Sequence, residues 1–457
     1  MHKGKKILAA LLLAAMVLGI LSACGAEDKP TDPQTETSSH DNMHRPSTED
    51  HVHTEDHVHT KDKPEHEKHD RNAELKTSLE SFSADLFKTQ YSMTENKTEN
   101  VFLSPFSVYA ALSMLQNGAG GDTLTEMEDV LGCSVKKEKD FFKKYIRRIG
   151  ESEESSLSLA NSLWINKDSE AQVNPKFIRE LEKSYNAEIF NDKADPETVG
   201  KINEWASDKT KGMIPSILSP DALNESTVTV LLNAVCFDAK WLDEYTEKDI
   251  SDMTFNNYDG STKDISFMHS TEYSYIKDEK ADGFIKYYKN GEDDPRYAFV
   301  AVLPEEGMNI DDYVSKYYEA DTISGLVENV ISEKVEAAMP KFKFDTKYEL
   351  PGALKSMGLN LMFDAENADL KQMAEYPNGN VSVDKVIHKA HIEVDEHGTK
   401  AAAVTAIDTV ANGIAPVEEV HTVVLDRPFM FAIYDCEENV VLFTGVYKTA
   451  EEGTVHQ

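Results

Sequence analysis

Apolar residues recur at helical spacing in the first part of the chain that has the composition of a folded protein. A helix is predicted to start near residue 73, because four apolar positions fall on one of its faces: Leu75, Leu79, Phe82 and Leu86. A second helix is predicted after Ser104-Pro105, since proline is preorganised for the first helical turn.

Strand-like composition follows later in the chain. Four segments are rich in β-branched and aromatic residues, namely 227–237, 296–303, 422–434 and 439–447. The last two are separated by residues 435–438 and should form a hairpin. Helices followed by strands, rather than the two alternating, favour the α+β class.

The first residues of the chain do not fit this folded pattern. Three lysines, at positions 3, 5 and 6, precede an uncharged run at 7–23 that is typical of a secretory signal and short for a membrane span. The run ends in Leu21-Ser22-Ala23-Cys24, which resembles the lipobox of bacterial lipoproteins. We therefore expect residues 1–23 to be a signal peptide and Cys24 to carry lipid. The mature protein would be secreted and anchored to the outer face of the bacterial cell membrane.

Residues 24–72 have almost no large apolar side chains and should form a disordered tether. Eight histidines lie between His40 and His69, and Thr-Glu-Asp-His-Val-His is repeated in tandem over residues 48–59. Two interpretations stay open. The tract is a low-complexity spacer without a cofactor, or it binds zinc or copper through His51, His53, His57 and His59.

Charge and cysteine content exclude several function classes. Acidic residues outnumber basic ones by 82 to 47, and a net charge of −35 repels phosphate backbones, so nucleic acid is not an expected partner. Beyond Cys24, an odd set of Cys133, Cys236 and Cys436 does not describe a disulfide framework, and the last two lie in apolar runs, as core residues would. The ordered region has no phosphate-binding glycine loop and no nucleophile elbow.

The segment 396–413 differs from the rest in its small, mostly uncharged side chains. Read with period two from Thr399, one face holds residues 399, 401, 403, 405, 407 and 409, all small or apolar, and the other holds Lys400 and Asp408. Such a strand can slide between two strands that are already packed. The alternative is an alanine-rich helix, which residues 401–403 favour and the β-branched residues after them oppose.

The chain resembles the serpin family, and the matching motifs occur in the family's order. They include NVFLSPFSV at 100–108, NSLW at 161–164, LNAVCF at 232–237, PKFKF at 340–344, the segment at 396–405, RPF at 427–429 and LFTG at 442–445. The resemblance implies a serpin domain over residues 73–450 with a tail at 451–457. Its fold would be α+β, with a large central β-sheet, further sheets, a bundle of helices and an exposed reactive-centre loop.

The resemblance also implies a protease inhibitor rather than an enzyme. A protease cleaves the loop and becomes acylated, and the loop then inserts into the central sheet as an extra strand that traps the protease. The hinge matches Glu396, Gly398, Thr399, Ala401, Ala402, Ala403 and Thr405. The scissile bond falls at Asn412–Gly413, with Val410, Ala411 and Ile414 as nearby alternatives. At about 3.3 Å per residue, the inserted strand would carry the enzyme roughly 45 Å.

A polar cluster beneath the opening of the sheet is implied at Ser104, Ser107, Asn233 and His388, with Trp241 near the entry point of the loop. The chain departs from the family at His397 and Lys400, where acidic residues are common. Lys400 falls on the outward face, so insertion should survive this change.

The residues of the bait loop indicate the class of protease. Asn412 suits a legumain-like cysteine protease, whereas the apolar residues around it suit elastase-like or subtilisin-like serine proteases. Trypsin-like enzymes are disfavoured because neither Lys nor Arg lies between Lys400 and Arg427. We expect a monomer. Two alternatives are a non-inhibitory serpin that serves as a surface binding protein, and a metal-binding lipoprotein that acts through the His-rich tether.

Overall fold

A computed structural model of the chain describes residues 72–149, 155–224, 227–291, 294–377, 379–399 and 419–450. Its helices lie mostly in the first half: α1 (Ala73–Met93), α2 (Pro105–Gln116), α3 (Gly121–Leu131), α4 (Val135–Arg148), α5 (Pro175–Tyr185), α6 (Pro196–Lys209), α7 (Ile310–Lys316), α8 (Thr322–Glu328) and α9 (Pro351–Ser356). None of these described helices has an apolar stretch long enough to span a bilayer.

Three sheets contain most of the strands. The central sheet has the order β12 (Phe342–Glu349), β14 (Lys385–Val394), β15 (Gly398–Thr399), β5 (Thr229–Lys240), β2 (Ser155–Asn166) and β4 (Glu188–Asp192). The C-terminal sheet has the order β1 (Val101–Leu103), β18 (Val440–Tyr447), β17 (Phe429–Asp435), β10 (Tyr297–Pro304), β9 (Ala281–Tyr287) and β8 (Tyr275–Lys277). The four-stranded sheet has the order β16 (Val420–Val424), β11 (Lys334–Pro340), β7 (Thr262–Glu272) and β6 (Ile250–Asn256). A short pair joins β3 (Gln172–Val173) to β13 (Ala374–Glu375).

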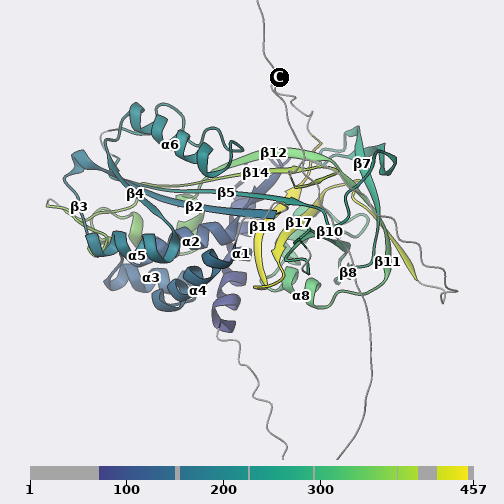
Figure 1. Ribbon diagram of the computed structural model, residues 1–457, viewed down its shortest axis with the longest axis horizontal. Helices are drawn as coiled ribbons and strands as arrows, with labels where there is room; N and C mark the ends of the chain where they lie inside the picture. The colour runs from purple at the N-terminus through teal and green to yellow at the C-terminus, as the bar shows by residue number, and fades with distance from the viewer. Residues whose placement is uncertain are drawn as a thin grey trace, which may run out of the picture. The chain divides into compact units, whose positions relative to one another are not determined.

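The central sheet lies between helices. Figure 1 shows α6 over one of its faces and α2 to α5 on the other side. The first turn of α2 is capped by Ser104, whose hydroxyl accepts the backbone N–H of Ser107 at 3.2 Å, and Pro105 occupies the first helical position. All twelve residues of α2 are buried, so this helix lies inside the protein, packed beneath the central sheet.

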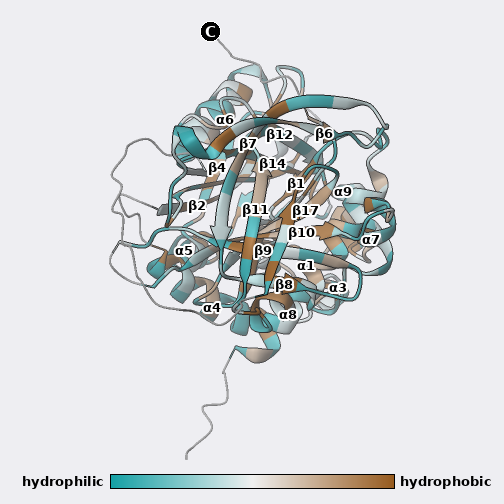
Figure 2. Ribbon diagram, turned by 90° about the vertical axis from the view of Figure 1, so that its right-hand side faces the viewer, coloured by the Kyte–Doolittle hydropathy of each residue, from teal (hydrophilic) through white to brown (hydrophobic). Residues whose placement is uncertain are grey.

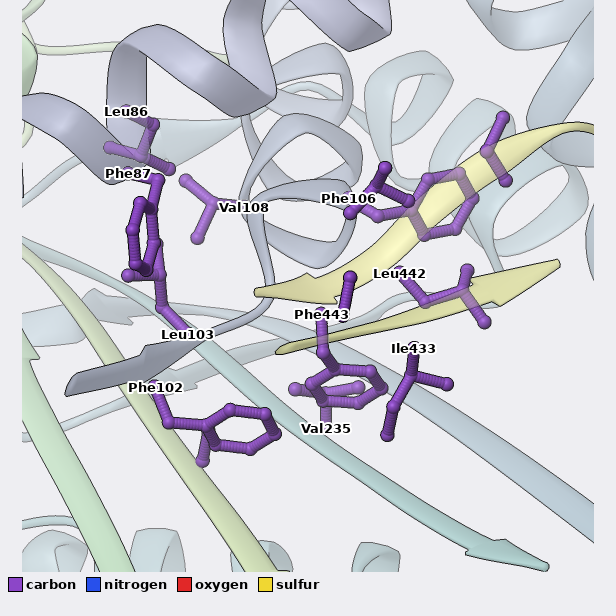
Figure 3. Close-up of a cluster of buried hydrophobic side chains, with 14 of the residues drawn as sticks. Leu86, Phe87, Phe102, Leu103, Phe106, Val108, Val235, Ile433, Leu442 and Phe443 are labelled. Atoms are coloured by element: carbon purple, nitrogen blue, oxygen red, sulfur yellow. The ribbon is translucent and has the colours of Figure 1, made fainter. Parts of the chain in front are cut away.

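Aromatic side chains form the centre of the main core. Phe102 from β1 stacks on Phe443 from β18, with ring centroids 5.2 Å apart, and Figure 3 shows these rings beside Val235 of the central sheet. Strands β10 and β17 are buried along their whole length and are largely brown in Figure 2. The core therefore joins the C-terminal sheet to the central sheet.

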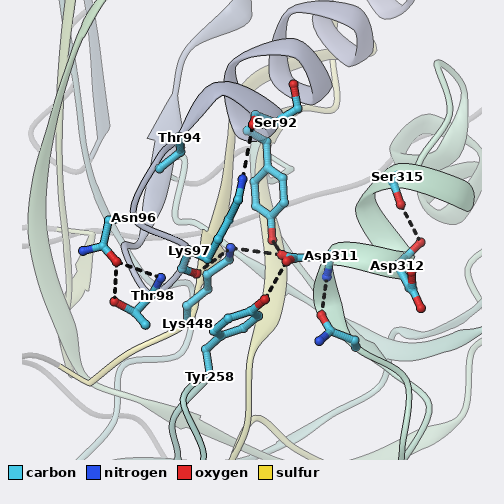
Figure 4. A network of polar contacts seen from close by, with 12 residues as sticks. Ser92, Thr94, Asn96, Lys97, Thr98, Tyr258, Asp311, Asp312, Ser315 and Lys448 are labelled. Atoms are coloured by element: carbon cyan, nitrogen blue, oxygen red, sulfur yellow. Dashed lines mark hydrogen bonds and ion pairs between the residues drawn. The ribbon is translucent and has the colours of Figure 1, made fainter.

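An ion pair between a buried lysine and a partly exposed aspartate lies at the end of β18. Lys448 is almost completely buried, and its amine donates to Asp311 at 3.1 Å and to the Lys97 carbonyl at 3.0 Å (Figure 4). Tyr258 also donates to Asp311, at 2.6 Å. Burial lowers the pKa of Lys448, a cost that the Asp311 carboxylate offsets.

The predicted α+β class is confirmed, and so are the helices near residue 73 and after Ser104. The hairpin is confirmed too, because β17 and β18 pair antiparallel. The single strand predicted over 422–434 is wrong. It is two strands in different sheets, because Pro428 lacks a backbone N–H and the chain turns there from β16 into β17. Cys133 and Cys236 are buried, whereas Cys436, expected in the core, is only half-buried.

Candidate functional site

The candidate site is the end of the central sheet where β14 and β5 separate. These strands pair directly, in parallel, from Lys385 opposite Val230 to Ala390 opposite Val235. Beyond that point β15 lies between them. Thr399 pairs with Val394 of β14 on one side and with Ala239 of β5 on the other, antiparallel to both. The first two residues of a further strand therefore already occupy a gap in the sheet.

Glycine is required at the first position of β15. A Cβ added to Gly398 would stand 2.0 Å from the backbone oxygen of Ala239 and 2.7 Å from Cα of Lys240. Thr399 follows with only 2% of its surface exposed, and its hydroxyl hydrogen-bonds that of Tyr288 at 2.7 Å. The backbone of β5 therefore leaves no room for a side chain at position 398.

The turn from β14 into β15 is held by the segment that follows β5. The Trp241 ring N–H donates to the carbonyl of Asp395, the Tyr245 backbone N–H to that of Glu396, and the Trp241 backbone N–H to that of His397, each at 2.9 Å. Three consecutive carbonyls are thus satisfied by one neighbouring segment. The Asp395 carboxylate closes the turn from inside by accepting the N–H groups of His397 at 2.8 Å and Gly398 at 3.1 Å.

Charged groups and aromatic rings surround this turn. Lys341 forms an ion pair with Glu396 at 2.6 Å. Burial disfavours the Glu396 carboxylate, but Lys341, a backbone hydrogen bond and the nearby His397 together outweigh burial and lower its pKa. Burial raises the pKa of Asp395 despite its two backbone donors.

Trp241 is fully buried and stacks on Tyr288, with ring centroids 4.5 Å apart. A rigid aromatic base therefore lies beneath the entering strand.

A buried hydrogen-bond network joins β14 and β5 farther along the sheet. His388 donates from Nδ1 to the amide oxygen of Asn233 at 2.8 Å, and its Nε2 accepts the backbone N–H of Ser104 at 3.1 Å. Ser107 donates to the same amide oxygen at 2.7 Å, and the Asn233 amide group donates to Asn161 at 2.8 Å. The network therefore fastens the two strands to each other and to α2.

The charge state of His388 follows from this geometry. One ring nitrogen must donate and the other must accept, so the imidazole is neutral with its proton on Nδ1. Complete burial lowers its pKa to about 3. Protonation would remove the acceptor that Ser104 uses, and would place an unpaired charge between the two strands.

The structure places the predicted residues in two groups. Ser104, Ser107, Asn233 and His388 form one network, and Trp241 lies at the entry point, where it bonds the turn and stacks on Tyr288. Glu396, Gly398 and Thr399 lie at the entry point. The remaining predicted hinge and cleavage positions, 401–405 and 410–414, lie outside the described residues, as do Lys400, Cys24 and the histidines at 51–59.

Sequence reasoning missed several residues of the site, namely Asn161, Tyr288, Lys341, Asp395 and Glu244, whose carboxylate lies 2.9 Å from Nδ1 of His397. Asn161 lay within a recognised motif, but its partner Asn233 is opposite it only through the pairing of β2 with β5. In the part of the chain that is described, no three His, Cys, Asp or Glu side chains gather as metal ligands would.

Comparisons with known proteins agree with this architecture. The family model "Serpin (serine protease inhibitor)" matches residues 77–449. An uncharacterized serpin-like protein of Thermococcus kodakarensis is 31% identical over 387 residues, which cover 82% of this chain and 86% of that protein. A leukocyte elastase inhibitor of Xenopus tropicalis is 32% identical over 397 residues, covering 82% of this chain and 99% of that protein.

Solved structures give the same result. The thermophilic serpin tengpin in its native state superposes with a TM-score of 0.75 at 34% identity, covering 82% of this chain and 94% of tengpin. Its latent state gives a TM-score of 0.71 at 32% identity, covering 83% of this chain and 98% of that chain. With the family model spanning nearly the whole described region, the chain belongs to the serpin family, which that model describes as serine protease inhibitors.

Proposed function

We propose that this serpin inhibits proteases as a suicide substrate. The observation that carries the proposal is the position of Gly398 and Thr399, which already pair between β14 and β5 as the start of an additional strand. A loop that continued in this register would carry no bulky side chain on its buried face as far as Thr405, because the residues on that face between Thr399 and Thr405 are Ala401 and Ala403.

The register also supports the proposed length of insertion. Gly398 faces Lys240 and Thr399 faces Ala239, so the same ladder would bring Thr409 opposite Thr229, the first residue of β5. The inserted strand would thus fill β5 from end to end. The proposed scissile bond, Asn412–Gly413, lies three residues farther on. A protease attached to Asn412 would be carried past the far end of the sheet, about 45 Å from the entry point at about 3.3 Å per residue.

The same register places one loop residue inside the polar network. On the β5 side Thr405 would lie opposite Asn233, and on the β14 side opposite His388. These are the two residues whose hydrogen bond now joins the strands. Insertion breaks that bond, and the Thr405 hydroxyl can donate and accept in its place. The cost of opening the sheet at this level is therefore offset once the strand is in position.

The chemistry of trapping needs no catalytic residue from the serpin. The protease's serine or cysteine attacks the carbonyl carbon of Asn412 or a near neighbour, the peptide bond breaks, and the new amino terminus leaves. The protease remains joined to the serpin as an ester or thioester. Insertion then displaces the enzyme before water completes hydrolysis, and distorts an active site that depends on sub-ångström positioning.

The apolar residues around the bond support elastase-like and subtilisin-like serine proteases as targets, and Asn412 supports a legumain-like cysteine protease. The experiment is to cleave the loop and compare melting temperatures before and after. Insertion predicts a large rise, because the new strand adds a full ladder of hydrogen bonds to the centre of the sheet. An unchanged melting temperature would favour the non-inhibitory alternative, a surface binding protein that retains a fixed loop.

The segment before residue 72 supports a location for this activity. We propose that Cys24 is lipidated and that the tether holds the domain, as a monomer, at the outer face of the cell membrane. The substitution Cys24→Ser should release the protein into the medium. Zinc or copper binding by the histidines at 51, 53, 57 and 59 is tested separately, by titrating each metal into a peptide covering residues 48–69.

A further inference from the structure

A histidine–glutamate pair lies at the entry turn, at a position where the family commonly has an acidic residue. His397 Nδ1 lies 2.9 Å from the Glu244 carboxylate. Both side chains are about a quarter exposed, at 29% and 24%, so the contact is partly screened but open to protons from solvent. His397 is the residue immediately before Gly398, the first residue of β15.

Glu244 is held in place from both sides. Tyr245, which follows it, is buried and donates its backbone N–H to the carbonyl of Glu396. Trp241, three residues before it, is fully buried and donates to the carbonyls of Asp395 and His397. The Glu244–His397 contact therefore adds a pair of charged side chains to a docking surface formed by backbone N–H groups and the Trp241 ring N–H.

The charged groups around His397 belong to three elements. Glu244 comes from the segment after β5, Lys341 from the junction of β11 and β12, and Asp395 and Glu396 from the turn itself. Lys341 is engaged by Glu396, and Lys286 of β9, which lies over the rings of Trp241 and Tyr245, is paired with Glu272. Glu244 is the carboxylate within hydrogen-bonding distance of the ring.

We propose that His397 and Glu244 are positioning residues for loop insertion, and that protonation of His397 strengthens their contact and holds β15 in its entry position. The inference rests on the proposed trapping mechanism and adds its dependence on pH. Imidazole is the side chain whose charge changes near neutral pH. A hydrogen bond between charged groups is stronger than one to a neutral ring. The contact is therefore stronger at pH 6 than at pH 8.

The consequence for inhibition has a definite sign. After acylation, the loop either inserts or is released by hydrolysis. Insertion that starts from a held Gly398–Thr399 ladder has its first pairings already formed. At acidic pH, a larger share of acylated inhibitor should therefore end as trapped complex. A partly exposed ion pair of this kind is worth a factor of about 1.5 to 5 in an equilibrium, so we expect an effect of about threefold.

The test uses the full-length protein with elastase or subtilisin, whichever forms the covalent complex. The ratio of cleaved to complexed inhibitor is measured at pH 6.0 and at pH 8.0. For the wild type this ratio should be about threefold lower at pH 6.0. His397→Gln should show the higher ratio at both pH values, and Glu244→Gln should do the same.

His397→Lys should show the lower ratio at both pH values, because lysine stays protonated throughout this range. His421→Gln is the matched control. His421 forms a similar pair with Glu333, at 2.5 Å, on β16 at the other end of the loop, and its removal should leave the pH dependence intact. Comparing variants at one pH cancels the pH dependence of the protease itself.

A second measurement needs no protease. The tryptophan fluorescence of the free wild-type inhibitor, to which Trp241 contributes together with Trp164 and Trp205, should change between pH 8 and pH 6 and should not change in Glu244→Gln. Complexes that form with the same partition and pH profile in wild type and His397→Gln would overturn this inference alone. Failure of every variant to form a complex at either pH would overturn the proposed trapping and this inference with it.

Discussion

Replacing Gly398 with alanine perturbs the entry of the loop with a single methyl group. The added Cβ would lie 2.0 Å from the Ala239 carbonyl oxygen, where contacts under 3.0 Å essentially never occur, so the strands must move apart by about 1 Å. The obstacle is backbone on an inner strand of the central sheet, and it cannot rotate away as a side chain would. We expect β15 to leave the gap.

The cost of this departure follows from the hydrogen bonds that β15 makes in the gap. When β15 leaves, its pairing with Lys240 and Ala239 of β5 and with Val394 of β14 breaks, together with the hydrogen bond between the Thr399 and Tyr288 hydroxyls. At about 1 kcal/mol for each net hydrogen bond, the loss of two of these bonds alone costs about 2 kcal/mol. That corresponds to roughly a 30-fold shift from the held to the released hinge. Insertion should slow accordingly, and the loop should be cleaved as an ordinary substrate.

The assay is the number of inhibitor molecules consumed per protease molecule trapped, measured with the protease that forms the complex. Gly398→Ala should raise this number by about an order of magnitude. Gly352→Ala in α9 is the matched control, because a Cβ there has nothing within 4 Å. Equal stoichiometry for Gly398→Ala, Gly352→Ala and the wild type would show that a held β15 is not needed for insertion.

Two further substitutions test other parts of the molecule. Thr405→Val preserves shape and removes the hydroxyl that would replace the bond between His388 and Asn233. It should leave the melting temperature of the uncleaved protein unchanged and lower that of the cleaved form by several degrees, and an equal effect on both forms would argue against the register. Glu138→Gln tests a buried carboxyl group. The Tyr109 hydroxyl donates to its Oε1 at 3.0 Å and also lies 2.9 Å from the Leu131 carbonyl oxygen. Burial raises the pKa of Glu138 from 4.5 to about 8, so its stabilising contribution is full below pH 4.5 and is lost as the pH rises toward 8. Glu138→Gln should match the wild type near pH 4.5 and exceed its free energy of unfolding by about 3 kcal/mol at pH 7. In denaturant titrations, a difference in unfolding free energy that stays constant from pH 4.5 to pH 7 would count against a buried acid.

Local signals in the sequence predicted the elements that depend on local chemistry. The four-residue spacing of Leu75 and Leu79 and the capping of α2 by Ser104 and Pro105 are properties of single helices, and both helices formed where expected. The segment at 422–434 was misjudged because both of its halves have strand composition. Which sheet each half joins depends on distant partners, β11 for one and β10 with β18 for the other.

The same distinction applies to the site. The hinge and the polar cluster could be placed from motifs, since Gly398 and His388 each lie in a recognisable segment. The sequence does not connect Trp241 and Tyr288, because they stack only where the residues that follow β5 and β9 pair with each other. Nothing near Glu244 in the sequence indicates that it faces His397, 153 positions away. Contacts of this kind come from the pairing of strands, and local composition does not record them.

Covalent trapping of a protease by this serpin can be tested by incubating it with elastase, subtilisin, legumain and trypsin and analysing the products on a denaturing gel and by mass spectrometry. We expect a stable adduct with one or more of the first three. Its formation should be accompanied by a released peptide that begins at Gly413 or within one or two residues of it. Clean cleavage of the loop by these enzymes, with no adduct at any ratio of inhibitor to enzyme, would contradict the trapping mechanism.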